Sequence, residues 1–186
     1  MDKERIRHRI RAYKELLSDE QRRAAADAVF SRLEELAAFM MAENVLMYHS
    51  LPDELQTHSF LDKWAGRKRF FLPRVNGVNL DILPYDKSRL HLGSFHIEEP
   101  DGDETASVEE MEMIVVPAVA YDKKGNRMGR GKGYYDRLME NSKATKVGVA
   151  YDFQMIDEID SEAHDVKVDI VITERRTIFT RRREEN

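Results

Sequence analysis

The sequence predicts an α/β protein in three layers, with helices on both faces of a mostly parallel central sheet. Strand-like apolar segments alternate along the chain with segments of helical periodicity, which is the arrangement that βαβ units produce. The apolar run at 113–120 shows no alternation with polar residues, and this favours a central parallel strand covered on both faces. We expect one domain over 1–186, with a frayed, charged tail from about 178 onwards.

Composition narrows the class of protein. Hydrophobic residues make up 41% of the chain and charged residues 35%, as in a globular protein with a strongly ionic surface. The net charge of −5 argues against a general nucleic-acid-binding protein, whose surface is usually basic. The absence of cysteine excludes disulfides and thiolate chemistry. There is no signal-peptide core at the start and no apolar run near the ~20 residues of a membrane span, so we expect a cytoplasmic protein without a membrane partner.

Two helices are predicted at the N-terminal end. Apolar residues at helical spacing predict the first over 2–17. A capping box at 18–21 predicts the start of the second, whose apolar residues continue to about Met40. Four basic residues share one face of the first helix, and such a charge run is usually a solvated face. These residues are Lys3, Arg7, Arg11 and Lys14.

The first strand is predicted over 45–48. The loop at 49–54 follows the carboxyl end of this strand, which is where open α/β sheets bind ligands. After the loop, Thr57 can cap a short helix that ends at Trp64.

An antiparallel hairpin is predicted on the flank of the sheet. Its strands are expected at 69–75 and 78–84, because Asn76-Gly77 between them is a strong hairpin turn signal. The acidic segment 98–110 is predicted to be a loop. Two further strands are predicted near the end of the chain, at 146–150 and 168–173.

The most informative segment is the glycine-rich turn at 127–137, which lies between the apolar run and a predicted helix over 134–140. Its centre alternates glycines with cations, and two arginines flank it; the residues are Arg127, Gly129, Arg130, Gly131, Lys132, Gly133 and Arg137. Glycine can adopt positive φ and lets a ligand approach the main chain. A strand, a glycine-rich turn and a helix start together direct backbone N–H groups at an anion. Since four cations would repel one another without a counter-ion, we predict a phosphate-rich ligand.

Two known phosphate loops have different spacing from this turn. A Walker A loop has four residues before Gly-Lys and then Ser or Thr, whereas five residues separate Gly125 from Gly131 and no hydroxyl follows Lys132. A dinucleotide fingerprint has two residues between its second and third glycines, whereas this turn has one. An exposed basic turn without a ligand is the alternative. Asp136 favours a ligand, because an acidic residue beside a cationic loop suggests a shared metal ion.

The segment 127–137, together with Val-Pro-Ala-Val-Ala-Tyr-Asp at 116–122, resembles the signature of the 5-formyltetrahydrofolate cyclo-ligase family. The family more often has glycine at the position of Ala118. The resemblance extends from Lys3 to about Glu174 and implies a Rossmann-like core. It also implies ATP- and Mg²⁺-dependent conversion of 5-formyltetrahydrofolate to 5,10-methenyltetrahydrofolate, with release of ADP and phosphate, through a phosphorylated N5-formyl group.

The resemblance also implies roles for particular residues. It implies that Arg130 and Lys132 are catalytic and that Asp136 and Asp165 hold Mg²⁺. The residues that it assigns to ATP are Lys3, Arg7, Arg127, Gly129, Arg130, Gly131, Lys132, Gly133, Tyr134 and Tyr135. Those that it assigns to the folate are Glu54, Phe95 and Tyr134, with core packing as the alternative for Phe95. Weaker matches to the family pattern are Ser50, Arg74 and Gln154.

Two other functions are open at this point. The basic turn and Tyr134-Tyr135 can be interpreted as a nucleic-acid finger with stacking side chains, against which the net charge of −5 counts. A phosphosugar-binding protein can use such a loop on a similar sheet, but it needs neither Glu54 nor the Lys3 and Arg7 pair. We expect a monomer with a small-molecule substrate and no nucleic-acid partner.

Overall fold

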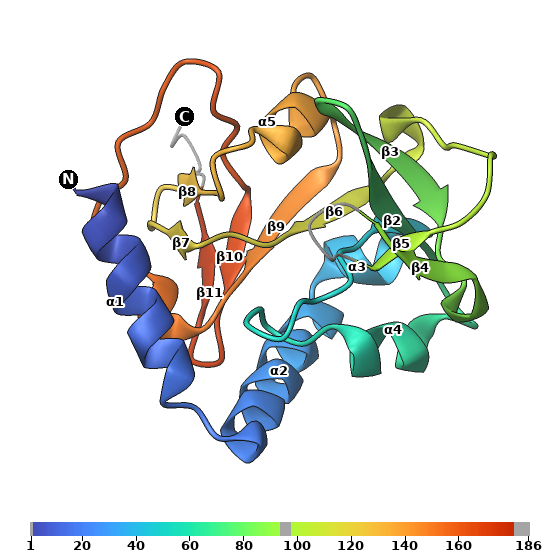
Figure 1. Ribbon diagram of the computed structural model, residues 1–186. Helices are drawn as coiled ribbons and strands as arrows, with labels where there is room; N and C mark the ends of the chain where they lie inside the picture. Colours follow the sequence, from blue (N-terminus) through green and yellow to red (C-terminus); the bar gives the residue numbers. More distant parts are fainter. Residues whose placement is uncertain (1, 94–97, 181–186) are drawn as a thin grey trace, which may run out of the picture.

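The computed structural model describes residues 2–93 and 98–180, and its elements surround one seven-stranded sheet (Figure 1). The helices are α1 (Lys3–Glu15), α2 (Asp19–Glu34), α3 (Ala37–Met41), α4 (His58–Trp64) and α5 (Tyr134–Met139). The strands are β1 (Asn44–Leu46), β2 (Arg69–Asn76), β3 (Asn79–Pro84), β4 (Leu90–Leu92), β5 (Glu98–Pro100), β6 (Met113–Val116), β7 (Ala120–Tyr121), β8 (Arg127–Met128), β9 (Thr145–Val149), β10 (Ile170–Ile172) and β11 (Thr177–Phe179).

The strands of the large sheet follow the order β11-β10-β9-β6-β1-β2-β3. Neighbours from β10 to β2 pair in parallel, whereas β3 and β11 pair antiparallel at the two edges, so the predicted mostly parallel sheet is confirmed. β1 and β6 lie side by side, with Val45 opposite Met113. From this pair the chain proceeds toward one edge through β2 and toward the other through β9. Such a reversal is a topological switch point, where a crevice for ligands opens at the carboxyl ends of the strands.

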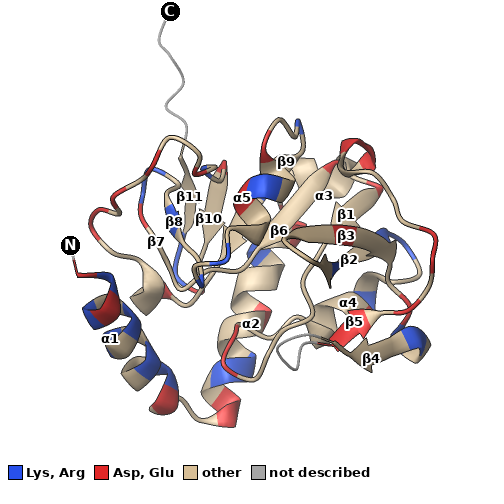
Figure 2. Cartoon of the chain, turned by 45° about the horizontal axis from the view of Figure 1, so that its top comes forward, with Lys and Arg blue, Asp and Glu red and all other residues tan. Residues whose placement is uncertain are grey.

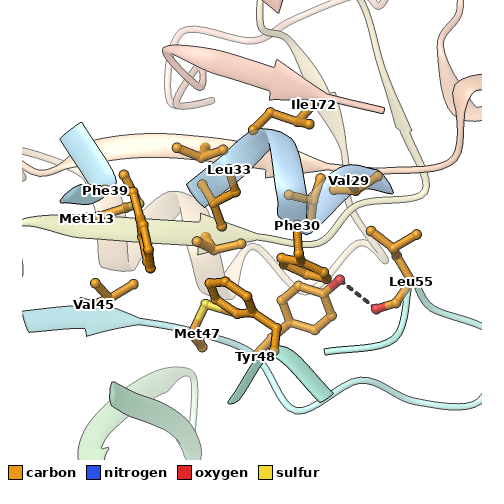
Figure 3. Close-up of a cluster of buried hydrophobic side chains, with 14 of the residues drawn as sticks. Val29, Phe30, Leu33, Phe39, Val45, Met47, Tyr48, Leu55, Met113 and Ile172 are labelled. Carbon is orange, nitrogen blue, oxygen red and sulfur yellow. Dashed lines mark hydrogen bonds between the residues drawn. The ribbon is translucent and has the colours of Figure 1, made fainter. Parts of the chain in front are cut away.

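Helices cover both faces of the sheet, as predicted. On β6, Met113 and Val115 belong to the hydrophobic cluster that α2, α3 and α4 complete, part of which is drawn in Figure 3. Ile114 and Val116 point to the other face and join the cluster that includes Met139 of α5. All four strand residues are fully buried, which explains why the sequence shows no polar alternation there. The second layer is the thinner one, because α5 has only six residues.

The predicted capping box is confirmed. Ser18 Oγ accepts the Gln21 N–H at 3.1 Å, and Gln21 Oε1 accepts the Ser18 N–H at 2.9 Å. Thr57 is the residue before α4, as predicted, but its hydroxyl does not cap that helix. It accepts the Ser50 N–H at 3.0 Å and donates to the Tyr48 carbonyl at 2.9 Å, so it closes the loop after β1 instead.

The prediction that the second helix continues to Met40 is wrong. α2 ends at Glu34, and Leu36 adopts an extended conformation with φ −68° and ψ 131°, so that α3 begins in a new direction. The bend buries Phe39 completely, with its ring centroid 5.5 Å from that of Phe60 on α4. Tertiary packing therefore ends a helix that intrinsic propensity would extend.

The central strand is shorter than predicted. β6 ends at Val116, because Pro117 has no N–H to continue the ladder. The chain then forms the small β7–β8 hairpin, and the Tyr121 hydroxyl donates to the Val116 carbonyl at 2.5 Å. The predicted strand over 113–120 is therefore two short strands with a bend between them.

Two segments expected to be irregular contain regular structure. The acidic segment 98–110 begins with β5 and includes a 3₁₀ turn over Val108–Glu110. Its Glu99 is buried and accepts the Val75 N–H at 2.5 Å, which holds β5 against β2. The expected tail from about 178 overlaps β11, which pairs with β10, so that part of the prediction is wrong. Residues 181–186 lie outside the described residues.

The predicted hairpin is confirmed as β2–β3 at one edge of the sheet. Its turn residues are Gly77 and Val78, one position later than the expected Asn76-Gly77, because Asn76 pairs with Asn79. Gly77 has φ +62°, and glycine at the first central position suits a type II′ turn.

The β7–β8 hairpin is held by the buried carboxylate of Asp122. This carboxylate accepts the N–H groups of Lys124 and Asn126, each at 3.0 Å, and that of Ile159, also at 3.0 Å. Ile10 of α1 packs on the same unit, in a small cluster with Ile159. The hairpin therefore joins α1 to the segment around 159. None of the helices within 2–93 and 98–180 is long and apolar enough to cross a membrane.

Candidate active site

A cavity of about 890 Å³ opens at the switch point between β1 and β6. The loop after β1, the segment from β6 to α5 and the inner face of α1 form its walls, and Figure 2 shows Lys and Arg residues along α1. The volume is in the range of small-molecule sites. Every residue that the sequence analysis assigned to catalysis, ATP, folate or Mg²⁺ lines this cavity, apart from Phe95, which lies outside the described residues.

The glycine-rich turn uses left-handed backbone at two of its three glycines. Gly131 has φ +94° and Gly133 has φ +68°, whereas Gly129 is not in that region. A Cβ added to Gly131 would meet no atom within 4 Å, so this part of the main chain is open. A Cβ on Gly133 would lie 2.8 Å from Nη1 of Arg137. The predicted close approach of a ligand to the main chain is therefore best supported at Gly131.

Arg130 joins the glycine-rich turn to the loop after β1. Its Nη2 lies 3.2 Å from Oδ2 of Asp53 and 3.9 Å from Oε2 of Glu54. The side chains of Arg130 and Asp53 are 56% and 55% exposed, so their ion pair contributes little free energy, and a phosphate can replace Asp53 as the partner. Lys132 is an exposed residue that lines the same cavity.

The other two cations of the turn, Arg137 and Arg127, point their guanidinium groups at protein acceptors. Arg137 donates from Nε to the Val78 carbonyl at 2.8 Å and from Nη2 to the Lys132 carbonyl at 2.8 Å, and it does not line the cavity. The expectation that all four cations share one ligand is therefore wrong for Arg137. Arg127 lines the cavity with a side chain only 6% exposed, and its Nη1 lies 3.5 Å from Oδ1 of Asp136. At this distance the guanidinium of Arg127 can orient the carboxylate of Asp136.

Glu54 is the carboxylate that faces the cavity from the loop after β1. Its side chain is 14% exposed, and its Oε1 accepts the Leu51 N–H at 2.9 Å. Burial raises the pKa of Glu54, while the Leu51 N–H and the Arg130 guanidinium act in the opposite direction. The loop itself is fixed by the Tyr48 hydroxyl, which donates to the Leu55 carbonyl at 2.8 Å (Figure 3). Glu54 is thus a preoriented acceptor.

The two carboxylates predicted to hold Mg²⁺ are brought to one wall of the cavity. Asp136 Oδ1 accepts the N–H of Val166, the residue after Asp165, at 3.1 Å. Asp165 Oδ2 accepts the Glu162 N–H at 2.8 Å. Over 2–93 and 98–180, no group of three or more His, Asp or Glu side chains could hold a metal by itself. The donor set nevertheless fits Mg²⁺, which typically uses one or two carboxylates together with substrate phosphates and water.

The remaining predicted residues have defined environments. Lys3 and Arg7 line the cavity from α1, and Arg7 also pairs with Glu4 at 3.1 Å. The Tyr134 hydroxyl lies 3.4 Å from the Gly77 carbonyl, and burial raises the pKa of Tyr135.

The side chains of the weaker family matches form hydrogen bonds with the main chain. Gln154 lines the cavity and donates from Nε2 to the carbonyl groups of Ala118 and Val119, at 2.9 and 3.1 Å. Ser50 Oγ accepts the Thr57 N–H at 2.9 Å. Arg74 donates to the Gly102 carbonyl at 2.7 Å and does not line the cavity.

Several cavity residues were not recognised as site residues in the sequence. Asp53 contacts Arg130, and Arg22 of α2 reaches the cavity beside the same loop. Lys14 was interpreted as part of a solvated stripe, yet the structure buries it. Its position on the face shared by Lys3 and Arg7 was the one available signal. His49 stacks on His58, with ring centroids 4.0 Å apart, and no sequence pattern indicated this pair.

Fold and site together define a Rossmann-like α/β protein with a large cavity, lined in part by charged side chains, at the carboxyl ends of its parallel strands. A model of the 5-formyltetrahydrofolate cyclo-ligase family matches residues 1–174, so the chain belongs to this family and is an enzyme of the ligase class.

Individual relatives agree with this assignment. The 5-formyltetrahydrofolate cyclo-ligase of Escherichia coli K12 is 29% identical over 174 residues, which cover 88% of this chain and 96% of that protein. The mouse protein of the same name is 28% identical, over 91% of this chain and 90% of its own length. The solved structure of 5,10-methenyltetrahydrofolate synthetase from Aquifex aeolicus is 33% identical, with a TM-score of 0.90, and the match covers 100% of this chain and 96% of that one.

Proposed function

We propose that this enzyme converts 5-formyltetrahydrofolate to 5,10-methenyltetrahydrofolate, with Mg²⁺ and ATP, and releases ADP and phosphate. One observation carries the proposal: Nη2 of Arg130, on the glycine-rich turn, lies 3.9 Å from Oε2 of Glu54, on the loop after β1. Cations suited to a transferring phosphoryl group thus stand beside the carboxylate suited to a pterin. Two ligands bound in one cavity are held in the proximity that a direct transfer between them needs.

The proposed reaction has two steps. The formyl oxygen attacks the γ-phosphorus of ATP, an O–P bond forms, the bond to the β-phosphate oxygen breaks, and ADP leaves. N10 of the folate then attacks the activated formyl carbon. The C–O bond breaks, phosphate departs with the former formyl oxygen, and N10 loses its proton. No protein nucleophile is required, which accords with a chain that has no cysteine.

The residues of the cavity supply charge and orientation for these steps. Arg130 and Lys132 are placed to neutralise charge on the moving phosphoryl group, assisted by the open main chain at Gly131. Lys3 and Arg7 on α1 can hold the nucleotide from the opposite wall. Asp136 and Asp165 are the residues that would hold Mg²⁺, which would supply positive charge to neutralise the phosphates. Tyr134 offers an aromatic surface to the folate.

A direct assay tests this function. Purified protein is mixed with 5-formyltetrahydrofolate, ATP and Mg²⁺, and the near-UV absorbance of the methenyl product is followed together with the release of phosphate. We expect both signals to rise in equal amounts and to depend on all three components. Release of phosphate without the methenyl absorbance would reject the proposed cyclisation.

The metal assignment predicts a specific defect. Replacing Asp136 by asparagine should raise the Mg²⁺ concentration needed for half-maximal activity by about tenfold or more, because a neutral amide is a weaker ligand for a hard cation. The measurement is an Mg²⁺ titration of the initial rate at saturating ATP. Asp157→Asn, on the same stretch of chain as Asp165 but outside the cavity lining, is the matched control. An unchanged Mg²⁺ requirement in Asp136→Asn would remove this residue from the metal site.

A further inference from the structure

Lys14 of α1 is a buried cation inside the cavity. It is 9% exposed and lines the same cavity as Glu54 and Arg130. Within the described residues its ammonium forms no ion pair with a carboxylate, although Asp53 and Glu54 lie close enough to influence it electrostatically. The largely buried position desolvates the ammonium, which disfavours its charged form. Burial accordingly lowers the pKa of Lys14.

The main chain fixes Lys14 beside the Glu54 loop. The guanidinium of Arg22, on α2, donates from Nη2 to the Lys14 carbonyl and from Nη1 to the Pro52 carbonyl at 3.2 Å. Pro52 lies two residues before Glu54, so one side chain joins the end of α1 to this loop. The main chain at Lys14 is therefore held beside the loop of Glu54.

The edge of a pterin has a fixed order of hydrogen-bonding groups. The 2-amino group and the N3–H are donors, and the 4-oxo group beside them is an acceptor. A carboxylate can accept from both donors, and its oxygens have lone pairs to spare even when one already accepts a backbone N–H. The 4-oxo group then needs a donor immediately beside the carboxylate. A buried site that leaves such an acceptor without a donor loses affinity.

We propose that Lys14 is a specificity-determining residue that donates a hydrogen bond to the 4-oxo group of the pterin while Glu54 accepts from N3–H and the 2-amino group. This inference rests on the proposed function, because it takes 5-formyltetrahydrofolate as the ligand of the Glu54 loop. Lys14 suits the role better than Arg130, which is 56% exposed, already pairs with Asp53 and belongs to the phosphate-binding turn. The ligand also supplies a hydrogen-bond acceptor for the desolvated ammonium of Lys14.

A cycle of four affinities tests the proposal. Calorimetry without ATP measures the binding of 5-formyltetrahydrofolate and of its 4-thioxo analogue, which keeps both donors but has a poor acceptor at position 4. We expect the wild-type protein to prefer the 4-oxo ligand by about tenfold or more. In Lys14→Met, affinity for the 4-oxo ligand should fall by about 10- to 100-fold, and the preference between the two ligands should disappear. Arg9→Met, an exposed change on the same helix outside the cavity, should retain the wild-type affinity for the 4-oxo ligand and the wild-type preference for it.

The outcomes separate this inference from its alternatives. Equal losses for both ligands would show that Lys14 only supports the loop, and loss of ATP affinity with intact folate binding would place it at the phosphates; either result overturns the proposal. Since removing a buried charge should not destabilise the ligand-free protein, we expect the variant to melt at the wild-type temperature or above. If Lys14→Met fails to fold, Lys14→Leu, whose side chain also lacks a hydrogen-bond donor, provides the same comparison. Wild-type protein that does not bind 5-formyltetrahydrofolate would instead reject the proposed function itself.

Discussion

Replacing Lys132 by alanine is expected to lower kcat by roughly 10²- to 10³-fold, which is the usual effect of removing one group that stabilises developing charge. Lys132 lies between Gly131 and Gly133, on the part of the cavity where the main chain is open. Its charge acts on the phosphoryl group during transfer, whereas the folate is held elsewhere. Calorimetric affinity for 5-formyltetrahydrofolate should therefore change by less than about threefold, and steady-state kinetics should show the loss in kcat.

Two comparisons make this result decisive. Lys143→Ala removes an exposed lysine from the segment just after α5, outside the cavity lining, and should leave kcat unchanged. Lys132→Arg keeps the charge and should recover part of the rate, although a guanidinium differs in shape from an ammonium. If Lys132→Ala turns over at the wild-type rate, Lys132 has no part in the chemistry.

Replacing Glu54 by glutamine should weaken binding of 5-formyltetrahydrofolate by about 10- to 100-fold. The change removes the charge and turns one acceptor into a donor that faces the donors of the pterin. Hydrogen bonds to charged groups contribute about 1.5–3 kcal/mol, and ~1.4 kcal/mol is tenfold in affinity. Calorimetry measures the affinity directly. Glu35→Gln, an exposed change at the end of α2, is the control for a general effect of losing one carboxylate.

The same assay contains two internal checks on Glu54. ATP binding in the absence of folate should be nearly unchanged; an equal loss for ATP would make Glu54 a structural support of the cavity. In the wild-type protein the pKa of Glu54 is raised by burial, and the ionised form is the acceptor. Folate affinity should therefore be complete above this raised pKa and decline as the pH falls through it, whereas the glutamine variant should lack this component of the pH dependence.

Local patterns predicted the parts of this fold that local interactions determine. The capping box at Ser18 and Gln21 requires only neighbouring residues, and the hairpin of β2 and β3 requires only a turn glycine, Gly77. The end of α2 at Glu34 depends on where Phe39 packs, which is a contact with another helix. No local pattern in the sequence contains that information.

In the candidate site, too, the residues that were predicted depend on local sequence and those that were missed depend on tertiary contacts. The glycine-rich turn is contiguous in the chain, so its residue types and spacing were visible before the structure was known. Lys14 is different, because its stripe on α1 cannot be told from a solvated face until the fold brings Lys14 and Glu54 to the same cavity. The orientation of Arg137 was also beyond sequence reasoning, since its acceptor on Val78 belongs to a hairpin 59 positions away.

That contact of Arg137 has an evolutionary consequence. Turns of surface hairpins generally accept insertions and deletions, because little else depends on their length. Here the turn at Gly77 and Val78 supplies the carbonyl that holds Arg137, and Arg137 in turn holds the Lys132 carbonyl of the phosphate-binding turn. A change in the length of this hairpin would therefore displace the phosphate-binding turn, although the hairpin turn itself does not line the cavity. We expect this turn to keep its length among natural variants of the enzyme.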